Sequence, residues 1–360
     1  MEEYKSFLKE RIERSWDFVK KFMLLLVLPI MLIGVLFHPL SPEAAANFSV
    51  TAVIPDNQID KSKTYFDLRM KPGQKQDLEV VLKNDTDKEI TIETNANTAV
   101  TNDNGIVDYS QTDPKLDKSL KTPFSEIAKT DDEAVLPANS SKTIKVTVTM
   151  PAASFDGIIL GGLQFIEKED PDAKKEDGKG VQIKNRYAYV VGVQLSENDT
   201  VVEPDMKLHA IKPQQINYRN VVTANLQNPE ATMIKPLMID AKVYKSGDDQ
   251  LLHQARRDNL RMAPNSNFNY AIDWENQPLK AGKYRLKMVA TSGDKTWKWD
   301  EEFTIKGDDA KKLNDTAVEL EKDYTWWYVA GGALALILLV LLAFWLGKRS
   351  KKDKDEDKKE

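Results

Sequence analysis

The sequence predicts a mainly β protein, with two tandem immunoglobulin-like β-sandwich domains between an N-terminal signal segment and one C-terminal transmembrane helix. Apolar and polar residues alternate in many short stretches, which is typical of strands with one buried face. Turn-forming pairs such as Pro72-Gly73 and Asn104-Gly105 separate these stretches. An uncharged apolar run from Val329 to Leu346 is long enough to cross a bilayer, for which about 20 residues suffice.

Residues 1–46 are expected to form an export signal. A polar, charged beginning leads into an apolar run from Phe22 to Phe37, and Ala44-Ala45-Ala46 then supplies the small-X-small pattern of a signal peptidase site. We expect cleavage before Asn47. An uncleaved membrane anchor is the alternative, which Pro29 weakens because proline interrupts a helix.

Residues 47–166 are predicted to form the first sandwich. Leu78, Val80 and Leu82 alternate with polar or smaller residues, and Ile144, Val146 and Val148 repeat the pattern. Short strands at this spacing favour a sandwich. A long insert between about residues 95 and 135 interrupts the rhythm, and loops of this length inside a compact domain are often functional.

Residues 167–180 are almost wholly charged and are expected to be a linker or a long exposed loop. The strand pattern then resumes, which predicts a second sandwich at residues 181–306. Its alternating stretches are Tyr187 to Val193, Val222 to Leu226, Ile239 to Val243, Phe268 to Trp274, Tyr284 to Met288 and Trp297 to Ile305.

The C-terminal part is predicted to be a stalk (307–323), a transmembrane helix (324–346) and a charged tail (347–360). Aromatic residues at Trp326 and Trp345 suit the two membrane interfaces, and Lys348 with Arg349 follows at once. The positive-inside rule keeps these basic residues cytoplasmic, so the chain is expected to be a single-pass cell-membrane protein with an extracellular N-terminal ectodomain. A buried core helix is the alternative.

The composition excludes several classes of function. The chain has no cysteine, so an exported domain must depend on its hydrophobic core, as suits a Gram-positive surface. The net charge of −5 gives no basic footprint for nucleic acid. The histidines, His38, His209 and His253, form no pair and no nucleophile motif is present, so we expect no catalytic residue, metal or cofactor.

Several blocks of sequence resemble the WxL-interacting protein family of Gram-positive bacteria. The order and spacing of the blocks carry the resemblance: Tyr65-Phe66-Asp67-Leu68, Lys71-Pro72-Gly73-Gln74, Asn102–Tyr109, Met150-Pro151, Phe155–Gly162 and, more loosely, Leu279–Tyr284. The resemblance implies a peptidoglycan-binding first domain and a second domain that binds host surface components, including the extracellular matrix. It also implies a non-enzymatic, membrane-tethered adaptor that holds surface proteins with WxL domains, which carry Trp-X-Leu motifs, near the wall.

A glycan strand needs hydrogen-bonding side chains beside an aromatic platform. The insert contains this mixture, so its glycan-binding candidates are Asn97, Thr101, Asn102, Asn104, Asp108 and Tyr109. The alternative is that these residues only build turns.

Two other stretches are candidates for binding a protein partner. The glycine-rich stretch Asp156–Gly162 could present a bare strand edge for β-augmentation, or could be a buried strand with a bulge. Trp297 and Trp299 project from one face of a strand and either bind a partner or pack in the core. The partner-binding candidates are Asp156, Gly157, Gly161, Gly162, Trp297 and Trp299.

Two functions of other classes stay open at this point. A cell-wall glycan hydrolase would need two carboxylates about 5–10 Å apart in a cleft, and the chain has many acidic residues. A transmembrane surface sensor would have to signal through a partner, because the tail from Lys348 is too short for a cytoplasmic domain.

Overall fold

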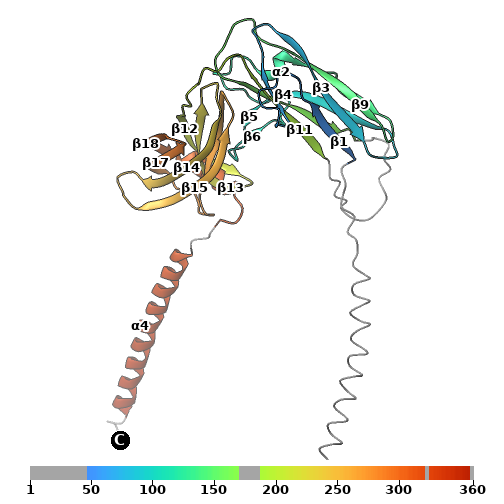
Figure 1. Cartoon of the computed structure of the whole chain (residues 1–360). Coiled ribbons are helices and arrows are strands. Elements are labelled where there is room, and N and C mark those ends of the chain that lie inside the picture. The colour runs from blue at the N-terminus through green and yellow to red at the C-terminus, as the bar shows by residue number, and fades with distance from the viewer. Residues whose placement is uncertain (1–46, 170–186, 321–323, 357–360) are drawn as a thin grey trace, which may run out of the picture. The chain divides into compact units, whose positions relative to one another are not determined.

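The computed structural model describes residues 47–169, 187–320 and 324–356, and these residues form a mainly β structure with two successive sandwiches (Figure 1). The expected signal segment 1–46 and most of the charged segment 167–180 lie outside the described residues.

The first sandwich consists of two sheets that share one core. The first sheet has the order β1 (Phe48–Val53), β3 (Lys75–Asn84), β9 (Ser141–Thr149), β7 (Ala128–Lys129). The second has the order β2 (Phe66–Arg69), β11 (Ala188–Ser196), β10 (Ile159–Glu167), β4 (Ile90–Thr98), β8 (Glu133–Leu136). Buried residues of both sheets belong to a single apolar cluster, which confirms the expected sandwich.

Strand β3 shows why the sequence folds in this way. Its Leu78, Val80 and Leu82 are fully buried, and the residues between them are partly exposed. Leu78 pairs with Val146 of β9, which is also buried, so the inward-facing residues of the two strands coincide. A slip of one residue would turn both sets toward solvent, which fixes the register.

Strand β11 belongs to the first sandwich, and our assignment of this stretch to the second sandwich is wrong. It pairs antiparallel with β10 and parallel with β2, and its Val191, Val193 and Leu195 lie in the first core. The charged segment therefore connects two paired strands of one sheet, and does not separate the sandwiches. Alternation predicts that a strand exists, but its partner depends on contacts that are distant in sequence.

The second sandwich also has two sheets. One has the order β12 (Lys207–Ile216), β13 (Arg219–Asn228), β16 (Ser266–Asp273), and the other β15 (Leu251–Met262), β14 (Ile234–Lys245), β17 (Gly282–Ser292), β18 (Lys295–Ile305). Tyr284 lies between two other aromatic rings of this core: it meets Trp274 edge to face, with ring centroids 5.7 Å apart, and stacks on Phe303, with ring centroids 5.5 Å apart.

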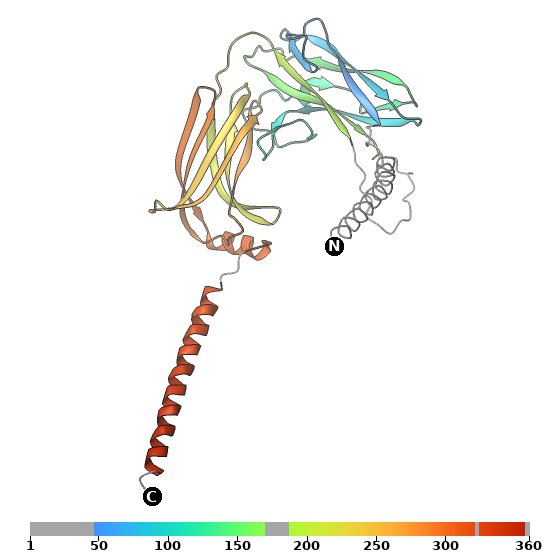
Figure 2. The ribbon, with the colours of Figure 1, turned by 60° about the horizontal axis from the view of Figure 1, so that its bottom comes forward.

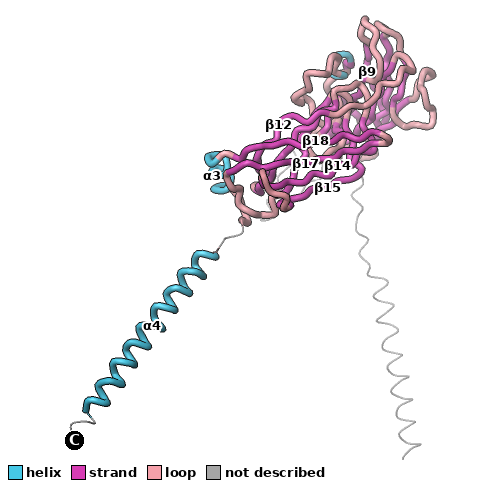
Figure 3. The backbone as a smooth tube through the Cα atoms, turned by 90° about the vertical axis from the view of Figure 1, so that its left-hand side faces the viewer, coloured by secondary structure: helices cyan, strands magenta, loops and turns pink. Residues whose placement is uncertain are grey.

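Helix α3 (Gly307–Thr316) is packed against the second sandwich, where we expected a free stalk (Figure 3). Ala310 is buried and Leu313 packs on the second core. The Asn314 side chain accepts a hydrogen bond from the Leu279 backbone N–H (2.8 Å) and donates one to the Leu279 carbonyl (2.9 Å). The second sandwich therefore includes α3.

Helix α4 (Thr325–Glu356) is the last element (Figure 2). Its stretch Trp327–Phe344 has a mean hydropathy of 2.4, and none of it is buried in the structure. Among the described residues, this is the one helix that is long and apolar enough to cross a membrane.

Candidate functional site

The predicted glycan-binding insert folds as a small hairpin and a series of turns. Strands β5 (Val100–Thr101) and β6 (Val107–Asp108) pair, and the Asn102 side chain accepts hydrogen bonds from the backbone N–H groups of Asn104 (3.1 Å) and Ile106 (3.3 Å). Asn104 itself is exposed at the tip. Asn102 therefore stabilises the turn.

Two of the six glycan-binding candidates are buried. The Asn97 side chain, 2% exposed, donates to the Tyr109 carbonyl (2.8 Å) and to Gln164 (3.2 Å). Thr101, 5% exposed, shares a 2.6 Å hydrogen bond with Ser266 of the second sandwich. Their polar atoms hold the fold and do not face solvent, where a glycan strand would bind.

Asp108 is held in a local network. Its carboxylate accepts hydrogen bonds from the Ser110 backbone (2.8 Å), the Ser110 hydroxyl (2.6 Å) and the Gln111 side chain (3.0 Å). Burial acts to raise the pKa of Asp108, but these hydrogen bonds, with a further one involving Asn102, leave the pKa below its ordinary value. The side chain is therefore a charged anchor of the turn.

The glycine-rich stretch lies on a central strand. Gly161 and Gly162 are buried in β10, which pairs with β11 on one side and β4 on the other, so the expected bare edge is wrong. A Cβ at Gly161 would lie 2.1 Å from the Phe124 ring, and one at Gly162 would lie 2.8 Å from Tyr109 Cβ. Both positions need glycine because an aromatic side chain packs directly on the strand.

Gly157 lies where the two sandwiches approach each other. It has φ +89°, and a Cβ would lie 2.3 Å from the Ala231 carbonyl oxygen. That carbonyl accepts a hydrogen bond from the Ile158 backbone N–H (2.8 Å). The glycine permits the positive φ and the close backbone approach at this contact.

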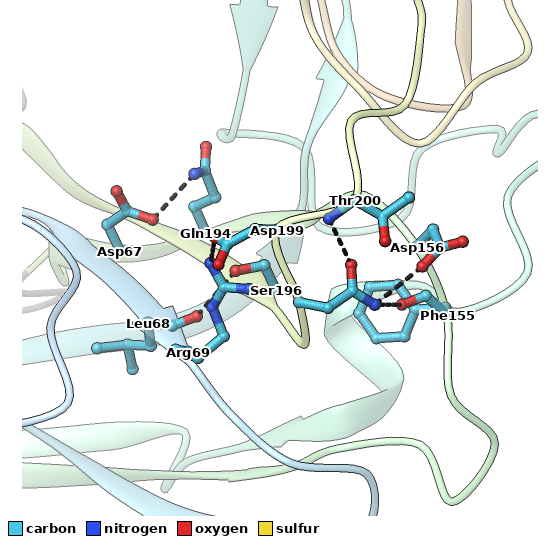
Figure 4. Close-up of polar contacts among 10 residues, drawn as sticks. Asp67, Leu68, Arg69, Phe155, Asp156, Gln194, Ser196, Asp199 and Thr200 are labelled. Atoms are coloured by element: carbon cyan, nitrogen blue, oxygen red, sulfur yellow. Dashed lines mark hydrogen bonds and ion pairs between the residues drawn. The ribbon is translucent and has the colours of Figure 1, made fainter.

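Asp156 belongs to a polar network that ties the loop before β10 to the loop after β11 (Figure 4). The Asn198 amide donates to the Asp156 carboxylate (2.9 Å) and to the Phe155 carbonyl (3.3 Å), and its oxygen accepts from the Thr200 backbone (2.8 Å). In the same view Arg69 forms an ion pair with Asp199.

Trp297 and Trp299 lie on β18, which is an edge strand of its sheet. Both are half-buried and pack on the second core. The Trp297 indole N–H donates to Asp205 (3.1 Å). One part of each tryptophan side chain therefore packs on the core, and the other part stays exposed at the edge of the sheet.

The contact between the sandwiches includes residues that sequence reasoning missed. The Asp117 carboxylate accepts hydrogen bonds from Gln227 (2.7 Å) and Asn267 (2.6 Å) of the second sandwich. The Ala263 N–H donates to Thr101 Oγ1 (2.9 Å), and the Arg261 N–H donates to the Gly105 carbonyl (2.8 Å). No local pattern marks these residues, because each partner lies more than 100 positions away.

One groove combines aromatic, apolar and basic side chains. It has a volume of about 860 Å³ and is open to solvent. Its lining includes Tyr65, Tyr109, the surface of β11, and Lys235 and Arg261 of the second sandwich; the remaining lining residues are Val50, Thr51, Ala52, Ile54, Lys61, Ser62, Lys63, Thr64, Leu160 and Met233. Tyr109 is thus the one predicted glycan-binding residue that the structure places in this groove.

The two tyrosines of the groove are held in place by the fold. Buried Gln58 donates a hydrogen bond to the Tyr65 carbonyl (2.8 Å), and Tyr65 Cβ lies 3.8 Å from where a Cβ on Gly192 would be. Tyr109 packs over Gly162, and its carbonyl is bound by Asn97. Tyr65 keeps 37% of its surface exposed. The groove is therefore a preformed site with an accessible aromatic side chain.

The described residues contain no group of three or more His, Cys, Asp and Glu side chains arranged to hold a metal ion.

Two family models match the chain. A model described as WxL Interacting Protein, peptidoglycan binding domain, matches residues 48–167, and one described as WxL Interacting Protein, host binding domain, matches residues 178–315. Together they cover more than half of the chain. The second match begins before β11, the strand that the structure adds to the first sandwich, and ends within α3.

Solved structures resemble the chain at low identity. A chaperone–tip adhesin pre-assembly complex from the Csu pili of Acinetobacter baumannii is 12% identical, with a TM-score of 0.30 and coverage of 71% of this chain and 98% of that one. The E. coli chaperone DraB is 14% identical, with a TM-score of 0.27 and coverage of 72% and 98%. No curated protein matches the chain.

Proposed function

Because the chain belongs to the WxL-interacting protein family, we propose that it is a membrane-tethered surface adaptor whose first sandwich binds peptidoglycan in the groove beside Tyr65 and Tyr109. The second sandwich binds host surface components. Both family models describe binding domains, and this supports a role without catalysis.

The groove carries the proposal. Its volume of about 860 Å³ lies in the range of ligand pockets, roughly 300–1,000 Å³. A tyrosine ring offers an apolar face to a sugar ring and a hydroxyl to its polar groups. The groove lies largely in the sandwich that matches the peptidoglycan-binding model.

The test is co-sedimentation of the ectodomain, residues 47–320, with purified peptidoglycan. Tyr65→Ala removes one stacking face, which is worth about 1 kcal/mol, so binding should weaken roughly fivefold. Tyr218→Ala is the matched control, because Tyr218 is 66% exposed and lies outside the groove. Equal binding by both folded variants would remove the groove from consideration.

We also propose that α4 anchors the chain with the sandwiches outside the cell and the basic tail inside. The apolar stretch Trp327–Phe344 and the following Lys348 and Arg349 support this orientation. The absence of cysteine makes a clean test possible. In intact cells, a membrane-impermeant maleimide should label Lys212→Cys and should label Lys352→Cys only after lysis. The reverse pattern would overturn the orientation.

For the protein partner, we propose the edge strand β18 with its half-exposed Trp297 and Trp299. An edge strand offers unpaired backbone N–H and C=O groups, and a tryptophan beside it can fill a partner's pocket. Asp156 is a second, smaller candidate at the surface next to Asn198, whereas Gly157 lies at the contact between the sandwiches. The partner is a surface protein with Trp-X-Leu motifs, as the family description suggests.

A further inference from the structure

We propose that the groove binds an anionic wall glycan, and that the second sandwich completes the site with Lys235 and Arg261. The inference rests on the proposed function and adds two points to it: the charge of the ligand, and the contribution of a domain that is not assigned to wall binding. The anionic groups are carboxylates of the peptide stems or phosphates of a polymer attached to them.

The charged side chains that line the groove are all basic. Its basic side chains are Lys61, Lys63, Lys235 and Arg261, and none of the lining residues that the structure describes is acidic. The chain as a whole carries a net charge of −5, so this local excess of positive charge runs against the average composition. A concave surface of one sign attracts ligands of the opposite sign.

Two of the four cations have no carboxylate partner in the described part of the chain. Lys61 lies 3.6 Å from Asp56, and Lys63 lies 3.6 Å from Asp60, in exposed pairs that contribute little. Among the described residues, neither Lys235 nor Arg261 lies within ion-pair distance of an acidic side chain, and both are exposed. These two charges are available to a ligand.

Arg261 is fixed at the junction of the sandwiches by its backbone. Its N–H donates to the Gly105 carbonyl (2.8 Å), and the neighbouring Leu260 side chain lies 2.8 Å from where a Cβ on Gly105 would be. Lys235 follows Ile234, which is fully buried in the second core. The backbones of Lys235 and Arg261 are therefore held in strands of the second sandwich.

Tyr65 and Arg261 also affect the pKa of the Tyr109 hydroxyl. Burial raises the pKa of the Tyr109 hydroxyl, Tyr65 adds to this effect, and the positive charge of Arg261 opposes it. Tyr65, Tyr109 and Arg261 all line the groove. One site can hold a sugar ring against tyrosine while a guanidinium pairs with an anionic substituent.

The experiment compares two double variants of the ectodomain, residues 47–320, by co-sedimentation with wall material. Lys235→Gln with Arg261→Gln should weaken binding about tenfold at low salt and flatten its salt dependence, because each exposed charge contributes about 0.7 kcal/mol and is screened by ions. Lys207→Gln with Lys212→Gln, on β12, makes the same charge change away from the groove and should bind like the unaltered protein.

Two wall preparations separate the sources of charge. Hydrofluoric acid removes phosphate polymers and leaves the peptide stems, so a tenfold difference between the variants that persists on treated wall assigns the carboxylates. A difference seen only on untreated wall assigns the phosphates.

The experiment distinguishes a failure of the anionic site from a failure of the proposed peptidoglycan-binding function. If Tyr65→Ala weakens binding but the Lys235 and Arg261 variant does not, the anionic site is overturned while the proposed function stands. If the unaltered ectodomain sediments with neither preparation, the proposed function fails, and this inference fails with it.

Discussion

Gly161 determines how the first sandwich packs around a single aromatic side chain. A Cβ there would lie 2.1 Å from the Phe124 ring, and Phe124 is fully buried. We predict that Gly161→Ala lowers the free energy of unfolding by roughly 1–3 kcal/mol, as overpacking does. Urea unfolding measures this. Gly192→Ala on the neighbouring strand is the control, because its nearest atom would be 3.8 Å away; an equal loss in both variants would contradict the packing argument.

His253 makes the stability of the second sandwich depend on pH. It is 4% exposed, its ring centroid lies 4.1 Å from that of Trp274, and its Nδ1 has no hydrogen-bond partner in the described structure. Burial lowers the pKa of His253 below 6.5, and Glu275 and Asp273 only partly oppose this. The unfolded chain therefore binds the proton more readily, so stability is fully present above pH 6.5 and declines as the pH falls below it.

The melting temperature measured at several pH values tests this effect. Between about pH 7.5 and pH 5, the unaltered ectodomain should lose more melting temperature than His253→Gln, which cannot titrate in this range. Parallel curves for the two proteins would show that His253 is not responsible.

Asn97 and Thr101 show the limit of sequence reasoning at this scale. Their residue types suit glycan binding, but their hydrogen bonds go to Gln164 and Ser266, which lie on other strands. A polar residue in an insert looks the same in sequence whether it faces solvent or a distant strand. Tyr109 was identified because it is the aromatic residue among the hydrogen-bonding residues of the insert, whereas Tyr65 was noted only as part of a family block.

At the scale of elements, alternation predicted strands well and their partners poorly. The strands around Leu78, Val146 and Ile239 lie where the period of two places them. Strand β11 was also predicted as a strand but assigned to the wrong sandwich, because its partners β10 and β2 are chosen by long-range packing. Helix α3 lies in the stretch that we expected to be a stalk, and its docking on the sandwich depends on Asn314, which no periodicity marks.

The loop around Asp117 joins the two sandwiches. Burial acts to raise the pKa of Asp117, but hydrogen bonds from Ser119, Gln227 and Asn267 lower it below the ordinary value, so the side chain is a charged acceptor. We predict that Asp117→Ala loosens this contact. The amide N–H groups of Ile158, Arg261 and Ala263, which donate across it, should then exchange with solvent at least several-fold faster.

Asp113→Ala is the matched control for that exchange experiment. Asp113 is exposed and lies on the same loop as Asp117. If the three amides exchange at the same rate in both variants, Asp117 does not hold the sandwiches together.

At the scale of the whole molecule, the sequence predicted two sandwiches followed by a long apolar helix. The two sandwiches are confirmed, and α4 contains the long apolar stretch that we expected. The groove was not predicted, because it combines Tyr65 and Tyr109 with Lys235 and Arg261, which lie far along the chain and on a different sandwich. The resemblance to a family of surface proteins implied a binding protein, but only the fold brings these side chains to one surface.

The adaptor role is the central claim, and capture of a partner by the immobilised ectodomain tests it most directly. The ectodomain, residues 47–320, would be attached to a sensor surface through its C-terminal end, where α4 follows in the full chain. A purified surface protein with Trp-X-Leu motifs should bind, and the same protein with each motif tryptophan changed to alanine should bind at least tenfold more weakly. Equal signals from the two proteins, or no binding by either, would contradict the adaptor account.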